Sequence, residues 1–333
     1  MVDQPRRDLL KKAAALGMGA MASANSGILR AEGVPSQSER KAGTSPYFPG
    51  FKRLSAKTPG ATINFVTAGS GPPLLLLHGY PQTHIEWRVV APELAKKFTV
   101  VAADLRGYGD SSAPADGDNH FGYSKRAMAQ DQVDLMASLG FQKFLVVGHD
   151  RGGRVAHRMA LDHPDRVTKL AVLDIIPTYK FFHSVTPELA TVNFHWFFLI
   201  QKPPLPETLI GNSAELWLET RFARLPAGTL SKEVFAEYLR CFRVPASIHA
   251  TCEDYRAGAT IDLVHDATDL DHKISCPVLA LWAERGAWPK LYDVLDTWRE
   301  RASNVSGRAM PSGHFIAEEV PEMLLAELNT FLG

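Results

Sequence analysis

The stretch "FLVVGHDRGGRVAH", residues 144–157, constrains the fold more than any other part of the sequence. An apolar run typical of a buried strand leads into Gly148, His149 and Asp150, and a helical pattern begins directly after them. A strand that turns sharply through glycines into a helix raises one side chain above the edge of a sheet. In this chain that side chain is Asp150, and Arg151 follows it. The stretch therefore predicts a strand–turn–helix unit with a carboxylate at its apex.

Short apolar runs alternate with helical patterns on both sides of this unit. The runs "PLLLL", "FTVVAA", "FLVV" and "KLAVLD" have the near-continuous apolar character of parallel strands that are covered on both faces. Strand character returns at "CPVLALWAE" and "VSGRAM", and a helical pattern, "PEMLLAELNTFL", closes the chain. Right-handed crossovers combine such strands into one open sheet. We therefore predict an α/β fold with a mostly parallel, doubly covered sheet.

Residues 180–262 interrupt this alternation. They are rich in aromatic residues, read as successive helices, and contain no strand-like run. The simplest interpretation is a helical cap inserted into one α/β core, whose two parts are residues 49–179 and 263–333. A length of 333 residues with 45% hydrophobic positions suits one large domain with such an insertion.

The first thirty residues differ from the rest. Arg6 and Arg7 precede a mildly apolar, alanine-rich segment with a small-residue sequence, "ASA", suited to cleavage. Residues 1–30 resemble a twin-arginine export signal. We expect cleavage near residues 24–31, a linker over residues 31–48, and a periplasmic mature protein. An ordinary amphipathic amino-terminal helix is the alternative, and it would leave the protein in the cytoplasm.

Charge and cysteine content exclude several classes of function. Lysine plus arginine and aspartate plus glutamate number 36 each, so no net field favours nucleic acid or an anionic membrane surface. Three widely spaced cysteines argue against a disulfide framework or a zinc site. We expect no nucleic-acid partner, and no membrane association after processing.

Three further segments follow predicted strands, at the sheet edge where open α/β sheets build their sites. "HGYPQTH" follows the run "PLLLL", Asp174 ends "KLAVLD", and His314 in "PSGHF" follows the last strand. The chain order Asp150, Asp174, His314 corresponds to the nucleophile, acid and histidine order of α/β-hydrolases. Glu284, after the following strand, is an alternative acid.

An aspartate nucleophile selects a reaction different from that of a serine. Its carboxylate is already ionised and displaces a leaving group from sp³ carbon, which gives an alkyl ester on Asp150. His314 then activates water to attack the ester carbon, and the backbone N–H groups of Tyr80 and Arg151 hold the oxyanion. Asp174 orients His314 and stabilises its protonated form. Dehalogenases and epoxide hydrolases both use this plan.

Arg151 and Arg154 distinguish these two classes. Burial under an apolar cap would raise the pKa of Asp150, and two guanidinium groups within reach would keep it ionised. Their planar forks also match a carboxylate on the substrate, so a small 2-haloacid satisfies both. An epoxide hydrolase instead needs cap tyrosines as proton donors. Tyr238 and Tyr255 are candidates for that role.

The ordered motifs "HGYPQTH", "DLRGYGDSS", "GHDRGGRVAHRMALDHPDRV", "HWFFLIQ", "EDYRAGA" and "PSGHF" resemble those of haloacetate dehalogenases, fluoroacetate dehalogenase in particular. The similarity runs from about residue 51 to the end of the chain. The resemblance implies the same triad, and it assigns the substrate carboxylate to Arg151 and Arg154. It also implies a homodimer that needs no metal or organic cofactor.

The resemblance places a halide pocket in the cap, at His195, Trp196 and Tyr255. Indole N–H, phenol O–H and imidazole N–H are donors that suit a developing halide ion. Taken alone, these residues are equally explained as core aromatics and a satisfied buried histidine. The resulting hypothesis is hydrolysis of a small 2-haloacid, such as fluoroacetate or chloroacetate, to a 2-hydroxy acid and halide. An epoxide hydrolase and a non-catalytic ligand-binding relative of the same fold are the alternatives.

Overall fold

The computed structural model describes residues 43–333, so the predicted export signal lies outside the described residues. Strand pairing begins inside the segment 31–48 that the sequence suggests is a linker. There β1 (Gly43–Ser45) pairs antiparallel with β2 (Phe48–Lys57). Phe48 is fully buried, and this burial attaches the end of the segment to the core.

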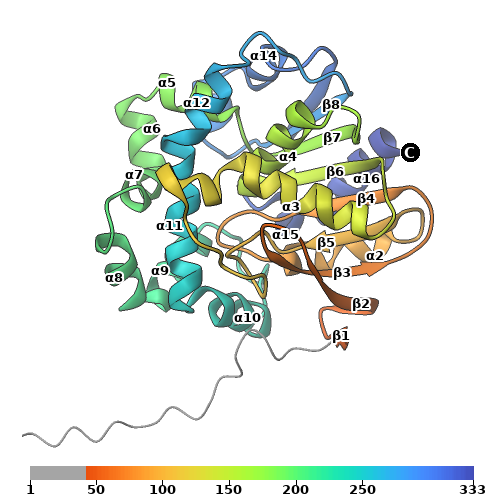
Figure 1. Cartoon of the computed structure of the whole chain (residues 1–333), viewed down its shortest axis with the longest axis horizontal. Coiled ribbons are helices and arrows are strands. Elements are labelled where there is room, and N and C mark those ends of the chain that lie inside the picture. The colour runs from red at the N-terminus through yellow and green to blue at the C-terminus, as the bar shows by residue number, and fades with distance from the viewer. Residues whose placement is uncertain (1–42) are drawn as a thin grey trace, which may run out of the picture. The chain divides into compact units, whose positions relative to one another are not determined.

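Nine strands form one sheet in the order β1-β2-β3-β5-β4-β6-β7-β8-β9 (Figure 1). The pairs β1–β2, β2–β3 and β3–β5 are antiparallel. The remaining pairs, along the order β5-β4-β6-β7-β8-β9, are parallel. The remaining strands are β3 (Thr62–Ala68), β4 (Pro73–Leu77), β5 (Thr99–Ala103), β6 (Phe144–His149), β7 (Val167–Leu173), β8 (Val278–Ala283) and β9 (Val305–Met310). The predicted mostly parallel sheet is confirmed.

The strand order reverses at β4, whose sheet neighbours are β5 on one side and β6 on the other. Such a switch point leaves a crevice at the carboxyl ends of the two diverging strands. The loop after β4 and the turn after β6 therefore face each other there. This topology places the "HGYPQTH" loop beside Asp150.

Helices cover both faces of the sheet, as the buried character of β4 and β6 requires. In Figure 1, α3 (Lys125–Ser138) and α4 (Asp150–Asp162) lie in front of the sheet, and α16 (Pro321–Leu332) lies behind it. The other core elements are η2 (His84–Arg88), α2 (Val90–Leu94), η3 (Asp118–Tyr123), α13 (Trp288–Leu291), α14 (Val294–Arg299) and α15 (Ile316–Glu319). Within residues 43–333, no helix has the length and apolarity needed to cross a bilayer.

Between β7 and β8 the labelled elements are all helices, drawn green to light blue in Figure 1, and an isolated bridge at Ile274 precedes β8. They are α5 (Thr178–His183), α6 (Pro187–Val192), α7 (Phe194–Leu199), α8 (Leu205–Gly211), α9 (Ala214–Phe222), α10 (Lys232–Phe242), α11 (Pro245–Ala259) and α12 (Ile261–Ala267). The helical series begins just before residue 180 and continues past residue 262, because α12 extends to Ala267.

Gly152 permits the closest approach between α4 and the loop after β4. Its N–H donates to the backbone carbonyl of His78 at 3.0 Å. A Cβ at position 152 would lie 2.4 Å from the carbonyl oxygen of Leu77, and backbone atoms cannot move aside as a flexible side chain can. The turn that presents Asp150 therefore depends on the missing side chain.

Replacing Gly152 with alanine should reduce the free energy of unfolding by about 2 kcal/mol or more, because the new methyl group collides with the backbone carbonyls of Leu77 and His78. Gly211→Ala is the matched control, since no atom lies within 4 Å of a Cβ there. Alanine is the better helix former, so that variant should be neutral or up to about 1 kcal/mol more stable. Urea unfolding measures both, and equal stabilities of the two variants would contradict the close-approach argument.

Candidate active site

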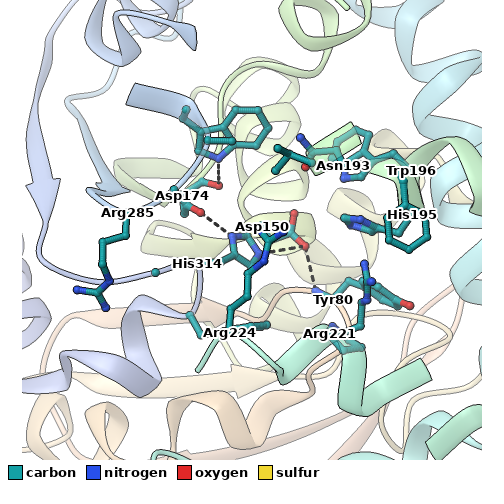
Figure 2. A pocket seen from close by; sticks show the side chains of 18 of the residues that line it. Tyr80, Asp150, Asp174, Asn193, His195, Trp196, Arg221, Arg224, Arg285 and His314 are labelled. Carbon is teal, nitrogen blue, oxygen red and sulfur yellow. Dashed lines mark hydrogen bonds and ion pairs between the residues drawn. The ribbon is translucent and has the colours of Figure 1, made fainter. Parts of the chain in front are cut away.

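The three residues of the predicted triad meet at the carboxyl edge of the sheet (Figure 2). Asp150 begins α4, Asp174 directly follows β7, and His314 lies in the loop after β9. The Nδ1–H of His314 donates to Asp174 Oδ2 at 2.6 Å, and its Nε2 lies 4.0 Å from Asp150 Oδ2. Glu284, the alternative acid, is exposed. The histidine thus lies between one acid that orients it and another that it faces.

Both acids adopt backbone conformations that favour glycine. The φ angle is 41° at Asp150 and 50° at Asp174, a region that costs an L-residue roughly 1–2 kcal/mol. Hydrogen bonds hold the second acid in place: its Oδ1 accepts from the Ala283 N–H at 2.9 Å, and its backbone carbonyl accepts from Trp288 Nε1 at 2.8 Å. Strained acids held by their surroundings are typical of functional sites.

The loop after β4 supplies an N–H donor to Asp150. The Tyr80 N–H donates to Asp150 Oδ2 at 3.2 Å. Gly79 allows this contact, because a Cβ there would lie 2.8 Å from the Cβ of Asp150. The second predicted donor, the N–H of Arg151, lies in the first turn of α4, where amides have no intrahelical acceptor.

Asp150 is buried, yet its carboxylate is kept ionised. Burial raises the pKa of Asp150, but the nearby charges of His314 and then Arg151 more than offset this and hold the pKa below its usual value. The hypothesis from the sequence attributed this effect to the arginines alone. The structure adds the histidine, whose charge makes the larger contribution.

Asp254 is a residue that the sequence analysis missed. Arg151 is fully buried, and its Nε and Nη2 donate to the two carboxylate oxygens of Asp254 at 2.9 and 2.7 Å. Among residues 43–333, only Nη1 of this guanidinium has no hydrogen-bond partner. Asp254 precedes Tyr255 in the quoted motif "EDYRAGA", so its position was visible but its pairing was not.

Arg154 has more unused donors. Its Nη1 donates to the carbonyl of Ile176 at 3.0 Å and to Oγ1 of Thr178 at 2.9 Å. Its Nε and Nη2 are buried and have no partner within the described part of the chain. Burial and the charge of Arg151 lower the pKa of Arg154 to about 10, so the group is still a cation at neutral pH.

A cavity of about 250 Å³ opens above the triad and runs between core and cap. Of the predicted site residues, six line it: Tyr80, Asp150, Asp174, His195, Trp196 and His314. The other three pack against this lining without forming part of it. The Arg154 guanidinium lies 4.5 Å from the ring of Trp196, and that of Arg151 lies 4.1 Å from the ring of Tyr255.

The three cap residues of the predicted halide pocket form one cluster with Tyr80. The Tyr255 ring lies 5.4 Å from the ring of Trp196 and 6.0 Å from that of His195. Within residues 43–333, the Tyr255 hydroxyl and the His195 Nδ1 are buried without hydrogen-bond partners. Burial, with the charge of Arg221, lowers the pKa of His195 to about 3. Burial raises the pKa of Tyr255, so both groups are neutral at neutral pH.

His149 and Glu86 form a buried ion pair that the sequence did not suggest. His149 Nδ1 lies 3.0 Å from Glu86 Oε1, and its Nε2–H donates to the backbone carbonyl of His314 at 2.9 Å. The other oxygen of Glu86 accepts the Gly79 N–H at 2.9 Å. This one ion pair therefore links the loop after β4, the turn after β6 and the loop after β9 that carries His314.

This pair makes stability depend on pH. Burial lowers the pKa of His149, but Glu86 raises it more, to about 9, against 6.5 for an ordinary histidine. The raised pKa contributes stability that is fully present below pH 6.5 and is lost as the pH rises through 9. A shift of this size corresponds to about 3 kcal/mol.

Glu86→Gln should remove most of this pH dependence. The free energy of unfolding of the wild type, measured in urea, should fall relative to that of the variant between pH 6 and pH 10. Glu93→Gln, which changes an exposed glutamate paired only with Lys96, is the control and should follow the wild type. Parallel curves for wild type and Glu86→Gln would show that the pair is not charged in the folded protein.

Known proteins share both sequence and structure with this chain. Residues 72–321 match the family described as alpha/beta hydrolase fold. A fluoroacetate dehalogenase of Burkholderia sp. is 46% identical over 86% of this chain and 95% of its own length. A soluble epoxide hydrolase of Corynebacterium sp. is 40% identical over 80% of this chain and 92% of its own length.

A solved structure of an alpha/beta hydrolase protein from Nostoc sp. PCC 7120 superimposes with a TM-score of 0.84 at 58% identity, covering 85% of this chain and 98% of its own. The family match spans most of the chain, and its description agrees with the mostly parallel sheet covered by helices on both faces. The chain therefore belongs to the α/β-hydrolase family and is a hydrolase of that fold.

Proposed function

We propose that this hydrolase cleaves the carbon–halogen bond of small 2-haloacids such as fluoroacetate and chloroacetate. The observation that carries the proposal is Arg154, which packs against the cavity residue Trp196 and lowers the pKa of Asp150. Within residues 43–333, this buried cation has two donors without a partner. A substrate carboxylate would pair with this cation, and charge-assisted hydrogen bonds of this kind are strong. The similarity to a fluoroacetate dehalogenase supports the same chemistry.

In the proposed first step, Oδ1 of Asp150 attacks the carbon that carries the halogen. The C–O bond forms as the C–halogen bond breaks, and the bonding electrons leave with the halide ion. Oδ2 is held by the Tyr80 N–H, so it remains the carbonyl oxygen of the resulting ester. Tyr255 and His195 offer neutral O–H and N–H donors to the departing halide.

In the proposed second step, Nε2 of His314 takes a proton from water, and the hydroxide formed attacks the ester carbon of Asp150. The Tyr80 N–H stabilises the negative charge that develops on Oδ2. Asp174, 2.6 Å from Nδ1, stabilises the imidazolium ion. The intermediate collapses as the ester C–O bond breaks, and the His314 imidazolium returns its proton to the departing oxygen, which gives the 2-hydroxy acid. The carboxyl group left on Asp150 loses its proton to solvent and is again a carboxylate.

Epoxide hydrolysis is the second candidate, because the Corynebacterium relative carries that name and Tyr255 has an unused hydroxyl. Opening an epoxide requires a proton donor for the oxygen that leaves carbon. Tyr238 does not suit this role, because it donates its hydroxyl to Glu318 at 2.7 Å. The buried Arg154 would also have no ligand to bind.

Intact mass measurement of His314→Asn separates the candidates. Mixed with chloroacetate, this variant should gain the mass of a carboxymethyl group and release chloride once, because it forms the ester but cannot hydrolyse it. Asp150→Asn, freshly purified, should gain no mass. An adduct with a neutral epoxide but with no 2-haloacid would favour epoxide hydrolysis. No adduct with either class would indicate a non-catalytic ligand-binding relative.

Arg154→Gln should reduce kcat/KM for chloroacetate by roughly 10- to 100-fold, mainly through KM, since a hydrogen bond to a charged group contributes about 1.5–3 kcal/mol. Chloroacetamide, the neutral analogue, controls for general damage to the site and should be affected much less. Halide release measured for both substrates provides the comparison. Equal losses for the two would argue against carboxylate binding by Arg154.

A further inference from the structure

Two cap arginines in the cavity have no role in the reaction proposed above. Arg221 belongs to α9 and Arg224 follows the end of that helix, and both line the cavity (Figure 2). In the view of Figure 2, Arg221 lies beside Tyr80, and Arg224 lies between Arg221 and Arg285. Within residues 43–333, neither Arg221 nor Arg224 forms an ion pair, whereas Arg285 pairs with Glu319 at 2.9 Å.

Arg221 is held in place by aromatic rings rather than by a carboxylate. Its guanidinium lies 5.0 Å from the ring of Phe194 and 5.1 Å from that of Trp217. Trp217 in turn donates its Nε1–H to the Tyr80 hydroxyl. The Nε of Arg221 is buried and has no acceptor among the described residues. Burial lowers the pKa of Arg221, and the charge of Arg224 contributes to the lowering.

The carboxylates that line the cavity do not neutralise these two cations. Asp174 is hydrogen bonded to His314. Glu319 accepts from Arg285 and from the Gly313 N–H at 2.7 Å. Asp150 accepts the Tyr80 N–H and is the proposed nucleophile. Arg221 is half-buried and Arg224 is exposed, so the cap side of the cavity carries positive charge that no lining carboxylate neutralises, and an anionic ligand would pair most strongly with Arg221.

The cavity is also larger than a haloacetate requires. At about 30 Å³ for each heavy atom, the volume share of one water molecule, a five-atom haloacetate occupies at most about 150 Å³. The cavity measures about 250 Å³. The remaining space of roughly 100 Å³, bounded on the cap side by Arg221 and Arg224, takes about three to four further heavy atoms by the same measure, the size of one CH2–COO⁻ group.

We infer that Arg221 and Arg224 form a second carboxylate-binding subsite, which holds the distal carboxylate of a 2-halo dicarboxylic acid of four carbons. This inference rests on the proposed function, which places the first carboxylate of such a molecule near Arg154 and its carbon–halogen bond beside Asp150. The second carboxylate extends toward α9 and meets the donors of Arg221. The natural substrate class is then halogenated dicarboxylic acids such as 2-chlorosuccinate.

Equilibrium binding of two hydroxy acids tests the subsite without any chemical step. Malate and lactate have the form of products and differ in that malate carries a distal carboxylate where lactate has hydrogen. Calorimetric titration of the wild type should give roughly tenfold tighter binding of malate than of lactate, the effect of one partly solvated charge-assisted interaction. Arg221→Gln should abolish that advantage, and Arg221→Lys should retain part of it.

Arg243→Gln is the matched control, because it removes an exposed arginine of the cap that does not line the cavity. It should leave the preference for malate unchanged. The inference is overturned if wild type binds malate no more tightly than lactate, or shows no measurable malate binding. It is also overturned if Arg221→Gln weakens both ligands equally, since Arg221 would then only shape the pocket or attract any small anion.

Halide release from chloroacetate tests the proposed function separately. Halide release without a preference for malate would support the dehalogenase proposal and refute the second subsite. A preference for malate that depends on Arg221, without halide release from any haloacid, would support the subsite and refute the proposed reaction. If both hold, kcat/KM for 2-chlorosuccinate should exceed that for 2-chloropropionate in wild type, and the two should become similar in Arg221→Gln.

Discussion

The close approach of two backbone segments at the carboxyl edge of the sheet is the constraint on which the site depends. Gly152, in the first turn of α4, donates to the carbonyl of His78, and neither Gly152 nor Gly79 has room for a Cβ. Because the loop and the helix touch, the Tyr80 N–H reaches the carboxylate of Asp150. A looser turn would leave the proposed ester on that carboxylate without a donor for its developing negative charge.

The same crowding concentrates cations around one carboxylate. Arg151 and Arg154 both lie within electrostatic range of Asp150 and lower its pKa. The charge of Arg151 is compensated by Asp254, whereas Arg154 forms no ion pair within the described part of the chain. A buried cation without a partner is costly unless a ligand supplies the anion. The charge balance of the site therefore favours an anionic ligand over a neutral one.

The parts of the site that the sequence predicts are those determined by local chain order. Asp150, Asp174 and His314 all follow apolar strands, and parallel strands bring their carboxyl ends to one edge. Pairings across the chain depend instead on side-chain packing. Arg151 and Asp254 lie 103 residues apart, and no pattern around either one joins them. For this reason the sequence alone predicts that both arginines bind a ligand, although most donors of Arg151 are already hydrogen bonded to Asp254.

The choice between carbon–halogen and epoxide chemistry depends on what faces the leaving atom, because nucleophile, base and acid are common to both. An opened epoxide leaves an alkoxide that must take up a proton, whereas a halide leaves as a stable anion and needs only hydrogen bonds. The Tyr255 hydroxyl suits either purpose, but Tyr238 is engaged by Glu318. His195 has a pKa of about 3 and so offers a neutral N–H rather than an acid. Among residues 43–333, the unpartnered Tyr255 hydroxyl, the neutral imidazole of His195 and the unpaired Arg154 support the proposed departure of a halide from an anionic substrate.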